Sequence, residues 1–137
     1  MEVASCTTPP DDPDYIEGAI ELVIDGVEII GKAEWDYVDQ LWSYVVTMIG
    51  DLLNNGESST YFPDQPISLA FVKKGKRVLV TSRVGPVNRT ASVEEADLIN
   101  TLVVAGRAFF EKLTELVGPT TGSYQMVLDE LTELSAR

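Results

Sequence analysis

Two pairs of carboxylates have a spacing that could support acid–base chemistry. Asp36 and Asp39 lie three residues apart, as do Glu94 and Asp97, so each pair falls on one side of an expected helix. Paired carboxylates can hydrolyse glycosides when they flank a bound sugar. The chain has no histidine, which removes the commonest general base. Because exposed helix acids are rarely catalytic, we interpret both pairs as solvated acids and expect no enzymatic activity.

The remaining reactive residues predict no metal and no cofactor. Cys6 is the single cysteine, so it can form neither an internal disulfide nor a zinc cluster, which is typical of a reducing, cytoplasmic compartment. The segment "DDPD" at 11–14 lacks the glycine and the distal glutamate of a calcium loop. The segment "KKGK" at 73–76 lacks the glycine spacing of a phosphate-binding loop, and we interpret it as a solvated hairpin tip.

The stretch Lys32–Val45, "KAEWDYVDQLWSYV", combines acids with aromatics at helical spacing. On a helix its aspartates would form an exposed stripe that continues to Asp51, and two tyrosines would lie at the border of that stripe. Tyrosines at such a border either cover the core edge or anchor a partner. Trp35 and Trp42 fall toward the apolar side and are expected in the core. The predicted partner-binding residues, with two acids added from the first hairpin, are Asp25, Glu28, Asp36, Tyr37, Asp39, Tyr44 and Asp51.

Charge is distributed very unevenly along the chain. The net charge is −12, and residues 1–64 hold fourteen acids against one lysine, which gives −13 for that half. The other half carries nine bases and eight acids, and its second hairpin is rich in lysine and arginine. An acidic balance of this size disfavours binding to nucleic acid or to an anionic membrane surface. It favours a protein partner with a basic surface.

Apolar spacing predicts one α+β domain over residues 16–137, preceded by a disordered acidic, proline-rich tail at 1–15. Asp25–Gly26 indicates a tight hairpin turn, Gly56 a helix end and Ser92–Glu95 a capping box. We expect a loop at 57–66 and another at 85–91. The predicted element order is ββαββαα, with an antiparallel sheet made from the two hairpins and with helices on one face. The expected elements are strands at 19–24 and 27–31, a helix at 35–53, a hairpin at 67–84, and helices at 92–117 and 124–135.

A small, acidic chain of hairpins and helices without catalytic residues resembles the immunity proteins of bacterial toxin systems. The resemblance covers Glu17–Leu134 through size, charge and element order, and "YFPDQPISLAF" at 61–71 is suggestive of it. It implies a stoichiometric inhibitor that caps a basic toxin domain, often a nuclease. Two alternatives remain: an acidic chaperone similar to those of type III secretion, which would be dimeric, and a domain whose acidity serves only solubility. The chain is therefore expected to be a monomer or a homodimer.

Overall fold

The computed structural model describes residues 1–7, 16–117 and 123–136. Within them the chain forms two antiparallel four-stranded sheets and three helices. The first sheet contains β1 (Glu2–Thr7), β2 (Glu17–Ile24), β3 (Val27–Ile30) and β4 (Asp36–Tyr37). The second contains β5 (Glu57–Tyr61), β6 (Ile67–Lys74), β7 (Arg77–Val84) and β8 (Val87–Glu94). The helices are α1 (Val38–Asn55), α2 (Glu95–Val117) and α3 (Ser123–Ser135). The predicted α+β class is confirmed, whereas the single sheet and the order ββαββαα are wrong.

The first sheet is built around β2. β1 pairs with one edge of β2 along its whole length, and β3 and β4 pair with the other edge. The prediction of a disordered tail is therefore wrong for Glu2–Thr7, while residues 8–15 lie outside the described residues. The segment "EVASCT" has too few apolar residues to be recognised as a strand, and it is ordered by backbone pairing with β2.

The turn between β2 and β3 agrees with the sequence. Asp25 and Gly26 have φ of 51° and 77°, and a two-residue hairpin turn of type I′ requires positive φ at both positions. Gly75, with φ of 64°, lies at the first position of the turn between β6 and β7, where a type II′ turn requires positive φ.

Helix α1 begins three residues later than expected. Residues Asp36–Tyr37 form β4, which pairs with Glu17 and Gly18 of β2, so the segment before Val38 is extended rather than helical. Trp42 is fully buried, as predicted for the core, but the same prediction is wrong for Trp35, whose exposed fraction is 39%. The helix ends as expected at Gly56, which has φ of 81° and donates its amide to the carbonyl of Leu52.

The second sheet contains two strands that the sequence did not predict. β5 and β8 occupy segments expected as loops, because neither has a run of large apolar residues. β8 turns back from β7 at Gly85, with φ of 59°, and places Ala91 and Val93 against the core. The predicted capping box is also wrong, because Ser92 lies in β8 opposite Leu79 and α2 begins at Glu95.

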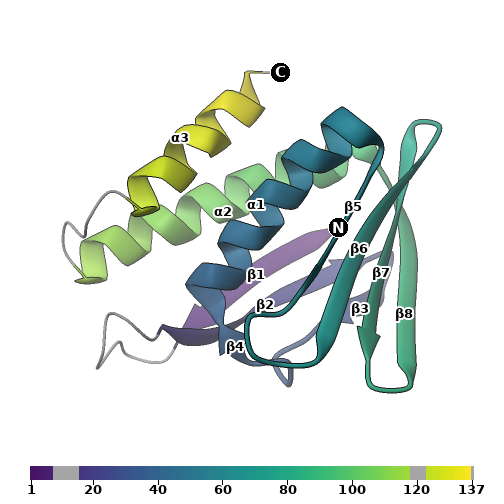
Figure 1. Cartoon of the computed structure of the whole chain (residues 1–137), viewed down its shortest axis with the longest axis horizontal. Coiled ribbons are helices and arrows are strands. Elements are labelled where there is room, and N and C mark those ends of the chain that lie inside the picture. The colour runs from purple at the N-terminus through teal and green to yellow at the C-terminus, as the bar shows by residue number, and fades with distance from the viewer. Residues whose placement is uncertain (8–15, 118–122, 137) are drawn as a thin grey trace.

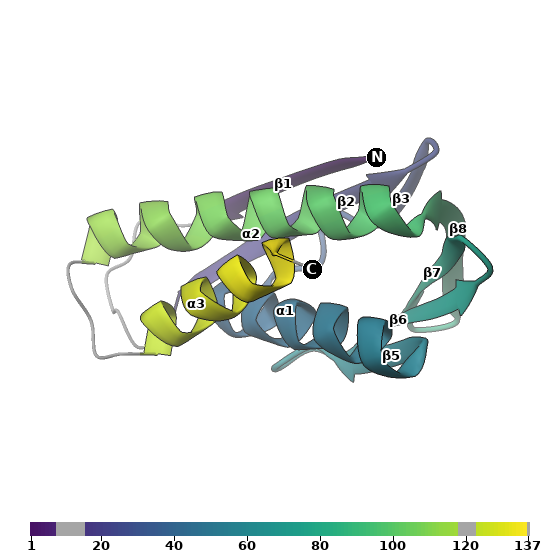
Figure 2. The same ribbon diagram turned by 90° about the horizontal axis from the view of Figure 1, so that it is seen from above.

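Helices α1 and α2 cover one face of the first sheet, and α3 packs on both of these helices. Figure 1 shows β1 and β2 running beneath α1 and α2. Figure 2 shows β7 and β8 at the end of the molecule where α1 ends and α2 begins, with α3 alongside both long helices. The Oγ atom of Ser82, on β7, donates a hydrogen bond of 2.6 Å to the carbonyl of Ile29, on β3, and so joins the two sheets. One apolar core runs through all of these layers.

Candidate partner-binding surface

Asp36 is a buried structural residue, and the prediction that it lies on the exposed stripe of a helix is wrong. Its exposed fraction is 6%, and its carboxylate accepts backbone hydrogen bonds from Tyr37 at 2.7 Å, Gln65 at 2.8 Å and Asp64 at 3.1 Å. The side chain therefore fastens the loop between β5 and β6 to β4. A carboxylate held by three amides is not available to steer a partner from the surface.

Asp39 also has an internal role. One carboxylate oxygen accepts the amide of Gln40 at 2.9 Å, and the other accepts the hydroxyl of Tyr124 at 2.9 Å. The second bond ties the start of α3 to the first turn of α1, where a negative charge also complements the helix dipole. The carboxylates of Asp36 and Asp39, the pair considered above for glycoside chemistry, thus both accept hydrogen bonds that stabilise the fold.

Tyr44 and Asp51 lie on the exposed side of α1, as predicted. They are seven residues apart, which corresponds to roughly 10 Å along a helix axis. The structure therefore leaves α1 with two separated surface residues from the predicted set, rather than a continuous acidic stripe.

The outer face of the first sheet brings together acids from three strands. On β2, Ile20, Leu22 and Ile24 are buried on the helix side, so the alternate residues point to the outer face. The pairing sets Glu21 opposite Ala4, and Val23 between Glu2 of β1 and Glu28 of β3. Glu2 and Glu28 are exposed. Since neighbouring strands lie ~4.8 Å apart, the backbones that carry these two acids are about 10 Å apart.

Aromatic residues border this face where β4 meets β2. Tyr37 lies opposite Glu17, so both share the outer face with Glu21. Trp35 and Tyr37 line a hollow of about 140 Å³ together with Glu17, Asp64 and Gln65. We define the acidic face by these residues and the exposed turn acid: Glu2, Glu17, Glu21, Asp25, Glu28, Trp35 and Tyr37. Aromatic groups beside carboxylates suit a lysine or arginine side chain, which both the charge and the ring faces attract.

Acidic side chains outnumber basic ones on the acidic face. Lys32 is the one basic side chain in residues 16–37, and its ammonium lies 3.4 Å from a carboxylate oxygen of Glu21, whereas Asp25 shares a polar cavity with Arg77. Lys32 is highly exposed, and such a surface pair contributes at most about 1 kcal/mol.

Several cations of the second hairpin are used inside the molecule. Lys73 pairs with Glu95 at 3.2 Å, and Arg77 donates to the Oγ of Ser92 at 2.8 Å. Arg89 forms an ion pair with the buried Glu34, which links β8 to the segment between β3 and β4. Each of these three cations therefore has a partner within the molecule.

Sequence reasoning found only part of the acidic face. It identified Asp25, Glu28 and Tyr37, but it placed Tyr37 on a helix and Glu2 in a disordered tail, and it left Glu17 and Glu21 out of the predicted set. The alternation in "EGAIELVI", with acids at 17 and 21 between apolar residues, is the signal that could have assigned them to one face of a strand.

The described residues offer little for metal or nucleophile chemistry. Ranges 1–7, 16–117 and 123–136 hold no group of three or more potential metal ligands. Cys6 is a half-buried free thiol on β1. A polar cavity of about 520 Å³ is lined by Glu94 and Asp97 together with Arg77 and Asp25, so acids and a guanidinium share it.

Comparison of the chain with family models, with curated proteins and with solved structures gives no match. Within the part of the chain that the structure describes, no helix is both long enough and apolar enough to span a membrane.

Proposed function

We propose that this protein is a non-enzymatic binding protein that docks a basic protein partner on its acidic face, in the manner of an immunity protein that neutralises a toxin domain. The observation that carries the proposal is the excess of acidic over basic side chains on that face. Glu2, Glu21 and Glu28 lie on three neighbouring strands, and like charges this close disfavour the folded state. A cationic partner would turn this unfavourable repulsion into attraction.

The form of the surface supports a role in protein recognition. The acids lie on paired strands, which fix their spacing more firmly than a loop would. Trp35 and Tyr37 add aromatic area at one end of the face, and aromatic side chains are enriched at the centres of protein interfaces. An acidic surface of this kind also imitates the phosphate charge that a nuclease cleft attracts, and it accelerates encounter with such a cleft.

A secretion chaperone is the second candidate, and one observation favours it. An apolar groove of about 430 Å³ lies open between β1 and α2, and chaperones of this kind hold clients along apolar surface. Size-exclusion chromatography separates the two functions, because the chaperone is expected to be a dimer and the capping inhibitor a monomer.

The proposal is tested by locating the surface that a co-purified partner covers. The tagged protein is used to isolate its partner at low salt, and the carboxylates of the free and the bound protein are then labelled with a carbodiimide and a neutral amine. We expect Glu17, Glu21 and Glu28 to lose labelling in the complex. The exposed acids Glu111 and Glu115 of α2 are the matched control and should label equally in both states.

Protection of the α2 acids with unchanged labelling on the first sheet would contradict the proposal. So would a partner with no basic surface. Titration of the partner's toxic activity should end at one equivalent of this protein, whereas a continued rise in inhibition beyond one equivalent would exclude stoichiometric capping.

A further inference from the structure

The first sheet has a free edge. Among the strands that the structure describes, β1 has β2 as its one neighbour, so every second backbone amide and carbonyl of β1 faces away from the sheet. An edge of this kind is a ready template for an additional strand. This edge is distinct from the acidic face, which is formed by the outward side chains of the sheet.

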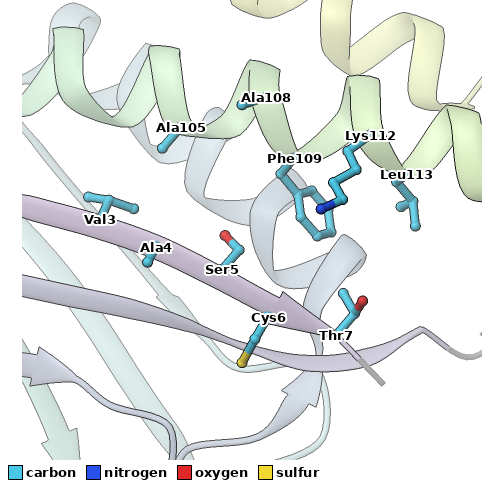
Figure 3. A pocket seen from close by; sticks show the side chains of 10 residues that line it. All are labelled: Val3, Ala4, Ser5, Cys6, Thr7, Ala105, Ala108, Phe109, Lys112 and Leu113. Atoms are coloured by element: carbon cyan, nitrogen blue, oxygen red, sulfur yellow. The ribbon is translucent and has the colours of Figure 1, made fainter. Parts of the chain in front are cut away.

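A groove runs along this edge between β1 and α2. Figure 3 shows Val3, Ser5 and Thr7 pointing from β1 toward α2, while Ala4 and Cys6 point the opposite way. On the helix side, the groove is lined by Ala105, Ala108, Phe109, Lys112 and Leu113, and its volume is about 430 Å³. The space exists because Ala105 and Ala108 have short side chains. Its volume lies within the range of pockets that bind ligands, ~300–1,000 Å³.

The walls of the groove are held in place before any ligand arrives. Phe109 stacks on the buried Trp42, with ring centroids 6.1 Å apart. The indole N–H of Trp42 donates a hydrogen bond of 2.9 Å to the Oγ of Ser5, which fixes β1 relative to α1. A preformed site reduces the ordering cost of binding.

Lys112 indicates the charge of the occupant. Its side chain extends from α2 toward β1, as Figure 3 shows, and among the described residues its ammonium makes no ion pair. A cation that has no ion pair among the described residues and lies beside an apolar groove favours a carboxylate in the ligand. The net charge of −12 opposes a second copy of this chain as the occupant, because the two molecules would repel each other.

We propose that this groove binds an extended peptide segment of another protein as an added strand on β1. The backbone of the peptide pairs with the free edge of β1, and its alternate side chains, which are apolar, enter the groove beside Ala105 and Ala108. A carboxylate of the peptide, either at its C-terminus or on an acidic side chain, pairs with Lys112. This inference is independent of the acidic face and holds whether or not that face binds a toxin.

The test is a selection of random octapeptides with free C-termini against the purified full-length protein. Peptides with apolar residues at alternate positions and one carboxylate should be enriched. Titration of the ¹⁵N-labelled protein with a selected synthetic peptide should shift the amide signals of β1 and of residues 105–113. Comparison of the peptide acid with its C-terminal amide identifies the source of the carboxylate, since the amide should bind more weakly where the C-terminus is used and equally where a side chain is used.

Variants distinguish groove binding from other contacts. Ala108→Trp fills the groove from an exposed helix position and should weaken binding at least tenfold, while Lys112→Gln should weaken it about threefold to tenfold. Lys76→Gln, at the tip of the second hairpin, is the matched control and should change nothing.

Three results would overturn the proposal. They are the absence of an enriched peptide class, peptides that bind Ala108→Trp as tightly as the wild type, and a dimer that Ala108→Trp dissociates. The third would show that a second copy occupies the groove.

Discussion

Replacing Asp36 should destabilise the protein strongly, because its carboxylate is the common acceptor of three backbone amides. A hydrogen bond to a charged group contributes about 1.5–3 kcal/mol, and removal of a buried partner adds the cost of unpaired donors. The three bonds share one side chain and are not additive, so we expect Asp36→Ala to lower the free energy of unfolding by about 3 kcal/mol. With an unfolding entropy of ~2.1 cal/mol/K per residue, this loss lowers the Tm of the 137-residue chain by about 10 °C.

Urea denaturation followed by circular dichroism measures this effect. Asp36→Asn keeps one acceptor oxygen and should lose about half as much stability. Asp51→Ala removes an exposed carboxylate from α1 and should change the free energy by less than about 0.5 kcal/mol. If Asp36→Ala and Asp51→Ala had equal stabilities, Asp36 would not anchor the loop between β5 and β6, and its assignment to the protein interior would fail.

Further stability predictions concern the contacts of β1, the ion pair of Glu34 and the helix end at Gly56. Ser5→Ala should lower the free energy of unfolding by about 1–2 kcal/mol, because the buried indole N–H of Trp42 loses its acceptor. Deletion of residues 1–7 should lower it further, and a truncated chain of unchanged Tm would contradict the role of β1. Glu34→Ala should lower the free energy of unfolding by about 2–3 kcal/mol, because Arg89 loses its buried partner. In a double-mutant cycle, Glu34→Met combined with Arg89→Met should recover part of that loss. Gly56→Ala should cost about 1 kcal/mol in the same denaturation assay, because φ of 81° disfavours a residue with a Cβ atom.

The sequence predicted those elements whose signals are local. The Asp25–Gly26 turn, the end of α1 at Gly56 and the helix at 123–135 agree with the structure, because turn chemistry and helical periodicity arise from neighbouring residues. The buried Trp42 was predicted for the same reason.

The strands that were missed are defined by distant partners. β1, β4, β5 and β8 are short or polar, and each is stabilised by a strand or loop that lies elsewhere in the chain. Helical spacing alone placed Asp36 on α1. Pairing of β4 with β2, and the amides of residues 64 and 65, override that local pattern.

The residues of the candidate site show the same contrast between local signals and contacts with distant parts of the chain. Charge counting correctly located the acidic half of the chain, but it could not show that Asp36 and Asp39 are held by internal donors. Nor could it show that Tyr37 and Glu28 share one sheet face, since that depends on the register of β2 with β3 and β4.

The measurement that tests the proposed function most directly is the association rate of the co-purified partner as a function of salt. The triple variant Glu17→Lys, Glu21→Lys and Glu28→Lys reverses the charge of the acidic face, and the control reverses Glu111, Glu115 and Glu133 on the helices, all of which are exposed. Electrostatic steering accelerates association by ~10–10³-fold, so the first variant should associate at least tenfold more slowly at low salt and lose most of its salt dependence. The control should stay close to the wild-type rate. Equal slowing in both variants would show that only the net charge of the chain matters, and it would contradict the acidic face as the binding surface.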